Sequence, residues 1–414
     1  MFSRVFLKKG EENELQQGFP WVFDNEIDFL KVMQKSGVTK FSLDTAPVKD
    51  GDVVEVYANA GGFLGTGIIN RKSKITVRII GKEYADRIME NPEAYYEQKI
   101  KDAFELRKLY FNREDSYRLI YGEADLIPGL IVERFCASDG KVFLVIQFLS
   151  LSAEVFRKEI VSALVKIIKP EGIYERDDAS VREKEGLLQQ TGWIYGSGTE
   201  KITIKENGIL LEVDIKNGQK TGYFLDQKFN RKSVAFLSKG KRVLDTFTHT
   251  GAFGLNCFSQ GAKEVTCVDL SEEAIDTVNK NIMLNNAENK VKAVCADVFD
   301  LLKQYEEQGE KFDLIILDPP AFTKSAKNIQ KAYGGYKEIN LRAMRLLNKN
   351  GILATCSCSY FFDESHFYGM IMNAAKDSKK HIQILQKSGA SPDHPVLSGY
   401  PKSDYLKCAV CRVM

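Results

Sequence analysis

The stretch VLDTFTHTGAFG, from Val243 to Gly254, begins as an apolar strand-like run and continues through a turn containing glycine into a helical pattern. In an open α/β sheet, such a strand-to-helix turn is where a nucleotide cofactor binds, because glycine lets the main chain approach the ligand closely. The carboxylate of Asp245 lies at the end of the strand, where it can hold a cationic group. Many strand-to-helix turns contain glycine, so the stretch alone predicts a cofactor site on an α/β sheet and leaves the cofactor open.

The residues beyond this stretch continue the same pattern, since apolar strand-like runs alternate with helical runs from Arg242 onward. That alternation predicts a parallel sheet with crossover helices. Strands are expected over residues 243–245, 265–269, 291–294, 314–317, 352–355 and 405–413. Ser271 is the expected N-cap of the helix after the second strand. We therefore expect a Rossmann-like sheet domain over residues 206–414.

Two further acidic residues end the next two strands. Asp269 follows Asp245 by about 20 residues, the spacing at which a carboxylate accepts hydrogen bonds from both ribose hydroxyls of a nucleotide. Asp297 follows the third strand, where it either contacts an adenine edge or is a simple turn residue. A nicotinamide cofactor would satisfy the same acids, so this pattern indicates a nucleoside without its chemistry.

The sequence DPPAF, from Asp318 to Phe322, follows the apolar strand at 314–317. Its two prolines fix the turn so that the Asp318 carboxylate faces the cleft beyond the strand end, and Phe322 could stack on a flipped base. In nucleic-acid methylases this kind of turn holds the target base near the sulfonium methyl group. The alternative is a rigid loop without a ligand.

The sequence ATCSCS, from Ala354 to Ser359, ends the next strand and is expected beside the DPPAF turn. Carbon 5 of a pyrimidine accepts a methyl group only after a thiolate has added to carbon 6, which makes carbon 5 enamine-like. We prefer Cys358 to Cys356 as the nucleophile because it lies nearer the strand end. Asp318 could hold N3 and the amino group of a cytosine.

The sequence of the first half of the chain predicts two smaller domains. Residues 1–77 alternate with period two between glycines, which predicts a small all-β domain. Residues 78–205 predict an α+β middle domain with helices at 93–109 and 153–168 and a strand at 142–148.

The composition predicts a protein that stays in the cytosol, because no signal peptide and no membrane-spanning run is found among its 414 residues. The net charge of +2 requires any nucleic acid to be held by local patches. Candidates are the run at 71–74 and a group formed by Lys324, Lys327 and Lys331.

The eight cysteines are expected to be reduced thiols. The close pairs Cys356/Cys358 and Cys408/Cys411 sit in strand-like runs unsuited to a zinc knuckle, so no metal is expected.

These motifs, together with QKTGYFLDQ from Gln219 to Gln227, resemble the class I rRNA large-subunit methyltransferase I family, which makes 5-methylcytosine in 23S ribosomal RNA. The resemblance covers nearly the whole chain. The first strands look like a PUA domain, and GEADLIPGL (122–130) and DHP (393–395) are also similar to the family. The family implies a Rossmann-like class I methyltransferase sheet, S-adenosylmethionine as methyl donor, 23S rRNA as partner, Cys358 as nucleophile and a cytoplasmic location. A homodimer is left open.

Two departures from the family pattern bear on the site. Ala321 stands where some members have Lys after the two prolines, and Cys356 is an additional thiol. The expected catalytic residues are Cys358 and Asp318. The expected substrate contacts are Pro319, Pro320, Phe322 and His394. The expected cofactor contacts are Asp245, Phe247, Thr250, Gly251, Phe253, Asp269, Leu270, Ser271, Asp297, Val298 and Asp318.

Three other functions compete with this interpretation. A methylase of exocyclic amino groups would use the same DPPAF turn and would need no thiol. A non-catalytic RNA-binding factor of ribosome assembly would carry a vestigial cofactor site. A nicotinamide oxidoreductase would leave the turn at 318–322 and the PUA-like domain without a role.

Overall fold

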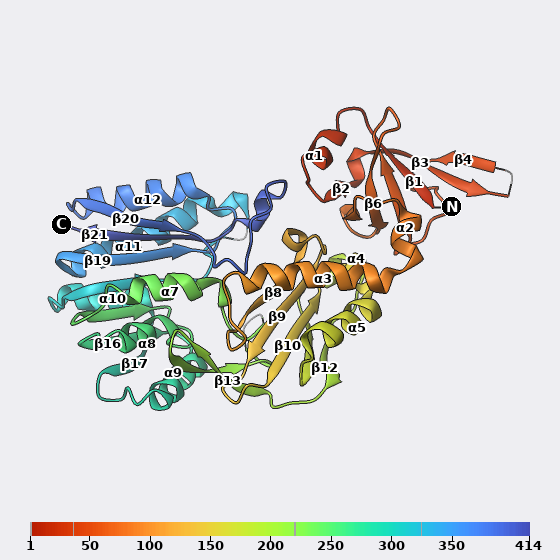
Figure 1. The fold of residues 1–414 in the computed structure, drawn as a ribbon. Coiled ribbons are helices and arrows are strands. Elements are labelled where there is room, and N and C mark those ends of the chain that lie inside the picture. The colour runs from red at the N-terminus through yellow and green to blue at the C-terminus, as the bar shows by residue number, and fades with distance from the viewer. Residues whose placement is uncertain (1, 36, 219–220, 324) are drawn as a thin grey trace. The chain divides into compact units, whose positions relative to one another are not determined.

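The computed structural model describes residues 2–35, 37–218, 221–323 and 325–414, and these form two compact units. The N-terminal unit comprises Met1–Lys201, Asp214–Tyr223 and Pro392–Ser403. The C-terminal unit comprises Ile202–Val213, Phe224–Ser391 and Asp404–Met414. Figure 1 colours the chain from red at the N-terminus to blue at the C-terminus. Gln219 and Lys220 of the family motif, and Lys324 of the proposed basic patch, lie outside the described residues.

A seven-stranded sheet with the order β2-β7-β6-β5-β1-β3-β4 forms the first part of the N-terminal unit. Its neighbours pair antiparallel except β1 and β5, which are parallel. One face of the strands is apolar and supplies a core that includes Val5, Leu30 and Val56, which confirms the predicted all-β domain. The elements are β1 Ser3–Leu7, α1 Glu12–Gln16, β2 Trp21–Phe23, β3 Ile27–Gln34, β4 Gly37–Phe41, β5 Val53–Tyr57, β6 Phe63–Ile69 and β7 Ile75–Gly81.

A five-stranded sheet with the order β12-β11-β10-β9-β8 follows in the same unit. Helices α3 and α5 supply Tyr96 and Leu164 to the core over this sheet. The helix predicted at 153–168 is interrupted at Phe156, whose ψ of 23° is not helical. The elements are α2 Ala85–Glu90, α3 Pro92–Lys108, β8 Tyr117–Tyr121, β9 Leu130–Cys136, β10 Val142–Phe148, α4 Leu151–Val155, α5 Arg157–Ile168, β11 Gly172–Asp177, α6 Val181–Lys184 and β12 Gln190–Gly196.

Buried ion pairs join the first sheet to the second. The Arg78 guanidinium on β7 lies 2.8 Å from Glu185 and 3.3 Å from Glu123. The Trp21 indole also donates to Glu123 at 2.8 Å. Because a buried charge is costly without a partner, these contacts bind the two predicted domains into one unit. The boundaries predicted at 77 and 205 stay predictions.

A second seven-stranded sheet, with the order β17-β16-β15-β18-β19-β21-β20, dominates the C-terminal unit and is drawn from green to blue in Figure 1. Strands β15 to β19 pair parallel with one another, and β21 is antiparallel to both β19 and β20. This confirms the predicted Rossmann-like sheet. The strands are β15 Arg242–Thr246, β16 Glu264–Asp269, β17 Val291–Cys295, β18 Phe312–Leu317, β19 Leu347–Ser357, β20 Ile382–Ser388 and β21 Lys407–Val413.

The order of this sheet reverses between β15 and β18, which are neighbours although two strands separate them in sequence. In such sheets ligands bind beyond the carboxyl ends of the strands at this reversal. Helices α10, α11 and α12 bury apolar side chains against one face, around Ile315 and Leu353. The other elements of the unit are β13 Lys201–Glu206, β14 Ile209–Asp214, α7 Lys228–Ala235, α8 Ala252–Ser259, α9 Glu272–Leu284, α10 Val298–Glu307, α11 Ile329–Leu346 and α12 Glu364–Asp377.

Among the residues that the structure describes, no helix combines the length and the apolar character needed to cross a membrane.

Candidate functional site

The turn between β15 and α8 has an unusual backbone conformation. Phe247, His249 and Gly251 all have left-handed φ values, of 57°, 54° and 78°. Residues other than glycine rarely adopt this backbone conformation, so the surrounding structure must hold it. The Thr248 N–H donates to the carbonyl of Val268 at 2.9 Å. The turn is therefore fixed in place by the end of β16.

Asp245 is the penultimate residue of β15, just before this turn, and is fully buried. Its Oδ2 accepts hydrogen bonds from the N–H of Gly254, at 2.9 Å, and from the Thr248 hydroxyl. Its Oδ1 is buried without a hydrogen-bond partner among the described residues. Burial, helped by the charge of Asp269, raises the pKa of Asp245 to about 7 against the lowering effect of its two hydrogen bonds. An unpartnered buried oxygen is costly, so this atom is a fitting acceptor for a ligand donor.

Gly254 lets α8 approach β16 closely. A Cβ at this position would lie 2.5 Å from the Cys267 sulfur and 2.9 Å from Val265 Cγ1. Both atoms belong to a packed strand that cannot move aside cheaply. The glycine therefore serves the helix-to-strand packing that brings the helix N-terminus to the cofactor turn.

Gly254→Ala is expected to lower the free energy of unfolding by about 1–3 kcal/mol, the usual cost of an added methyl group in a packed site. Urea denaturation measures it. Gly334→Ala in α11 is the matched control, because a Cβ there meets nothing within 4 Å. The control should leave stability unchanged or raise it by up to about 1 kcal/mol. Equal destabilisation by both changes would contradict the packing argument.

Asp269 and Asp297 reach the same edge of the sheet as Asp245, because β15, β16 and β17 are parallel. Asp269 accepts from the His249 N–H at 2.9 Å and from the Ser271 N–H at 3.0 Å. Asp297 caps α10, since its Oδ1 accepts from the Phe299 N–H at 2.8 Å. Each carboxylate keeps acceptor capacity beyond these bonds. The structure brings the three predicted acids together, and their contacts with a nucleoside stay predictions.

The other predicted cofactor residues surround these acids. Ser271 caps α9 as predicted, because its Oγ accepts from the Ala274 N–H at 3.2 Å. Leu270 beside it is 66% exposed, whereas Phe253 and Val298 are buried. The Asn281 side chain, which the sequence did not single out, donates to the Thr250 carbonyl at 2.8 Å and so holds the turn from α9.

Asp318 follows β18 directly and belongs to a hydrogen-bonded chain that the sequence did not reveal. Its Oδ1 accepts from the Gln227 side chain at 2.8 Å, and Asn230 donates to Gln227 at 2.7 Å. Burial raises the pKa of Asp318 to about 7, helped by the charges of Asp226 and Asp245. Near neutral pH the carboxyl group can therefore be either protonated or ionised.

Phe322 lies in an aromatic cluster. The centroid of its ring is 4.5 Å from that of Tyr336, 5.9 Å from that of Phe299 and 6.4 Å from that of Phe247. Pro319 is buried and Pro320 is exposed. The cluster holds the Phe322 ring from several sides, so its stacking on a base stays a prediction.

The two candidate thiols differ in access. Cys356 is fully buried in β19 opposite Cys408 of β21. Its contact with Cys408, together with burial, raises the pKa of Cys356 well above the ordinary value. Cys358 follows the last residue of β19 and is partly exposed. A thiol must be reachable and able to ionise to attack a substrate, so the structure favours Cys358.

Tyr336 links the neighbourhoods of Cys358 and Asp318. Its hydroxyl accepts from the Ser357 hydroxyl at 3.1 Å. Burial raises the pKa of Tyr336 to about 12, and the charges of Cys358 and Asp318 also act to raise it. Both predicted catalytic groups therefore lie near one hydroxyl group.

His394 belongs to the N-terminal unit and is buried there. Its Nδ1 lies 3.0 Å from Asp393 Oδ1, and its ring centroid is 5.2 Å from that of Tyr121. Its contact with substrate stays a prediction. Within the described ranges, no group of three or more His, Cys, Asp or Glu side chains could hold a metal ion.

Comparisons with known proteins add a family context to this geometry. Residues 186–395 match the S-adenosylmethionine-dependent methyltransferase family, and residues 5–82 match a PUA-like domain. The chain is 39% identical to the ribosomal RNA large subunit methyltransferase I of Aeromonas salmonicida, over 99% of this chain and 98% of that protein. It is also 39% identical to the protein of the same name from Photobacterium profundum, over the full length of both. A solved candidate SAM-dependent methyltransferase from Streptococcus mutans has the same fold, with a TM-score of 0.79, 23% identity and full coverage of both chains.

Proposed function

The chain belongs to the ribosomal RNA large subunit methyltransferase I family, and from this we propose that it forms 5-methylcytosine in 23S rRNA through a covalent adduct of Cys358. The coarser activity follows from the family: the protein is an S-adenosylmethionine-dependent rRNA methyltransferase. The observation that carries the finer proposal is the partly exposed Cys358, which follows β19 next to the strand that ends at the Asp-Pro-Pro turn. A cytoplasmic location and a homodimer stay predictions.

The residues at the strand ends fit S-adenosylmethionine. Asp245 offers a buried oxygen without a partner for a donor of the methionine portion, and Asp269 and Asp297 offer carboxylate oxygens for the nucleoside. The left-handed turn at 247–251 lets the main chain approach the ligand. When bound, S-adenosylmethionine supplies an electrophilic methyl group.

Asp245→Asn is expected to weaken S-adenosylmethionine binding about tenfold or more at pH 8, because the neutral amide cannot pair with a cationic group. The pKa of Asp245 is raised to about 7. In the wild type, affinity should therefore rise between pH 6 and pH 8 as the carboxyl group ionises, and the variant should lose this dependence. Calorimetry at both pH values measures it. Asp300→Asn, an exposed acid in the first turn of α10, is the matched control. Equal affinity of wild type and Asp245→Asn at pH 8 would exclude this role.

The Cys358 thiolate starts the proposed reaction on the base. Its electron pair forms a bond to carbon 6 of the cytosine, and the ring electrons that are displaced make carbon 5 nucleophilic. After carbon 5 has accepted the methyl group, loss of the carbon 5 proton to a base re-forms the double bond and releases the thiolate. Cys358 is thus unchanged at the end of the cycle.

Asp318 supports the same reaction through its proton. Because its pKa is raised to about 7, a large share of the carboxyl group is protonated at neutral pH and can donate to N3 of the cytosine. A proton transferred from Asp318 to N3 neutralises the negative charge that the attacking thiolate introduces into the ring, and it returns to Asp318 when the thiolate leaves. Gln227 holds one oxygen of this carboxyl group at 2.8 Å and so orients it.

The test is a map of 5-methylcytidine in 23S rRNA from a strain that lacks the protein, compared with the same strain complemented by wild type or by Cys358→Ala. One site should disappear without the protein, return with the wild type and stay absent with the variant. Loss of an N-methylated nucleotide instead would favour the amino-group methylase. No change in the methylation of 23S rRNA would overturn the proposal.

A further inference from the structure

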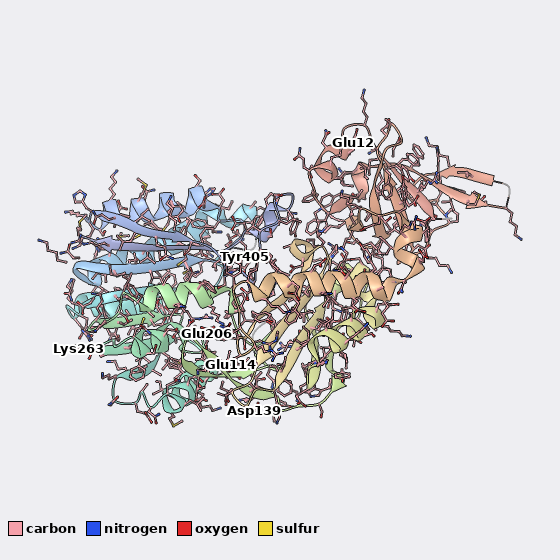
Figure 2. All side chains as sticks on the ribbon, in the orientation of Figure 1. Glu12, Glu114, Asp139, Glu206, Lys263 and Tyr405 are labelled. Carbon is pink, nitrogen blue, oxygen red and sulfur yellow. The ribbon has the colours of Figure 1, made fainter. Side chains whose placement is uncertain are left out.

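Lys407, the first residue of β21, is a buried lysine beside Cys358. It pairs with Ser357 across the two strands, so it flanks the residue that precedes Cys358. Its ammonium donates to the carbonyl of Ser359 at 2.6 Å and to that of Tyr405 at 2.8 Å. Figure 2 labels Tyr405, two residues before Lys407 in the chain. Lys407 thus contacts the residues on both sides of Cys358: Ser357 through strand pairing and Ser359 through its ammonium group.

The Lys407 ammonium lacks the partner that a buried charge usually has. The residue is only 7% exposed, and none of the ion pairs among the described residues includes it. Both of its hydrogen bonds end on neutral carbonyl groups. A buried ammonium without an anionic partner is costly, and a negative charge that forms nearby would offset this cost.

The charges that face Lys407 point to Cys358. Burial lowers the pKa of Lys407, and the charge of Cys358 is the largest effect that raises it again. The other acids that face it are Asp404, Asp363 and Glu364, all of them exposed and screened by water. Tyr336 is also near Cys358, because the charges of Cys358 and Asp318 both act to raise the pKa of its hydroxyl group.

We propose that the Lys407 ammonium stabilises the Cys358 thiolate through its charge, which makes Lys407 a positioning residue for the nucleophile. This inference rests on the proposed function, in which Cys358 attacks carbon 6. The thiol proton leaves to water, and the fixed positive charge lowers the free energy of the anion that remains. Since Lys407 is held by two carbonyl groups, its charge is in place before the substrate binds.

The test is the pH dependence of Cys358 alkylation by iodoacetamide, followed for each cysteine peptide by mass spectrometry without RNA or cofactor. Lys407→Gln should raise the midpoint for Cys358 by about one pH unit, because the amide keeps a donor for the carbonyl groups and loses the charge. Lys407→Arg should keep the midpoint near that of the wild type. Alkylation of Cys295, an exposed thiol in β17, serves as the internal control and should not change.

Two outcomes would overturn the proposal: an unchanged Cys358 midpoint in folded Lys407→Gln, or an equal shift in Lys407→Arg. If Lys407→Gln does not fold, the wild type alone decides, since its native Cys358 midpoint must lie below that of the same peptide in denaturant. The methylation rate of Lys407→Gln should be lower than that of the wild type at pH 7 and recover as the pH rises. A separate measurement tests the proposed function itself. If Cys358 is not the nucleophile, the wild type will form no Cys358 adduct with RNA that contains 5-fluorocytidine.

Discussion

Cys358→Ala should abolish methyl transfer to rRNA, with a loss of about a thousandfold or more in turnover. Without the thiolate, carbon 5 of cytosine stays too poor a nucleophile to accept a methyl group. Affinity for S-adenosylmethionine should stay within a few-fold of wild type, because Cys358 follows β19 and is not among the residues proposed for the cofactor. Turnover is measured by transfer of labelled methyl groups to rRNA transcripts, and cofactor binding by calorimetry.

Cys356→Ala is the matched control for this prediction. Cys356 lies two residues earlier but is fully buried opposite Cys408, so its loss should cost stability and leave most of the turnover. RNA containing 5-fluorocytidine should attach covalently to wild type and to Cys356→Ala, since fluorine replaces the proton whose departure releases the thiolate. Attachment to Cys358→Ala, or full turnover by it, would exclude the covalent mechanism.

Asp318→Ala should lower the turnover about 10²–10⁴-fold, the range over which a positioned general acid contributes. The expected mechanism also predicts the pH profile. The pKa of Asp318 is raised to about 7, so its protonated form is present below that pH and is lost above it. Cys358 needs the opposite change, because its thiolate forms as the pH rises. The wild-type rate should therefore pass through a maximum.

Asp318→Asn separates the two limbs of this profile. The amide can still contact the base but cannot lose a proton, so the decline at high pH should disappear while the rise at low pH remains. The same change should remove the share of Asp318 in the loss of stability expected as the pH rises from about 4 to about 7, the interval in which the unfolded chain has lost this proton and the native state still holds it. A variant that keeps both limbs would show that another group controls the high-pH decline.

Much of the fold and the position of the site could be predicted from local sequence. The strand-to-helix turn at 243–254, the Ser271 cap and the strand before Asp318 depend on residues close together in the chain, and each was found as predicted. The parallel sheet then brings Asp245, Asp269 and Asp318 to one edge, because parallel strands end on the same side. Residue types at strand ends were therefore enough to predict that these acids lie together, and their contacts with a cofactor stay a prediction.

The residues that tune the site were not predicted, because they come from segments far apart in sequence. Gln227 orients Asp318, and Asn281 holds the Thr250 carbonyl. The only local signal for Lys407 was its position at the start of the strand 407–413, which is apolar except for Lys407 and Arg412. The interruption of the helix at Phe156 was likewise invisible to helical periodicity.

By itself, the sequence determined which strands end in an acid, a proline turn or a thiol, since these depend on neighbouring residues. Only the tertiary structure decided which thiol is accessible and which charges face it. The pairing of Cys356 with Cys408 buries one sulfur, and the antiparallel return of β21 puts Lys407 beside the other. Burial and charge at a point depend on every segment packed around it, so they exist only once those segments meet.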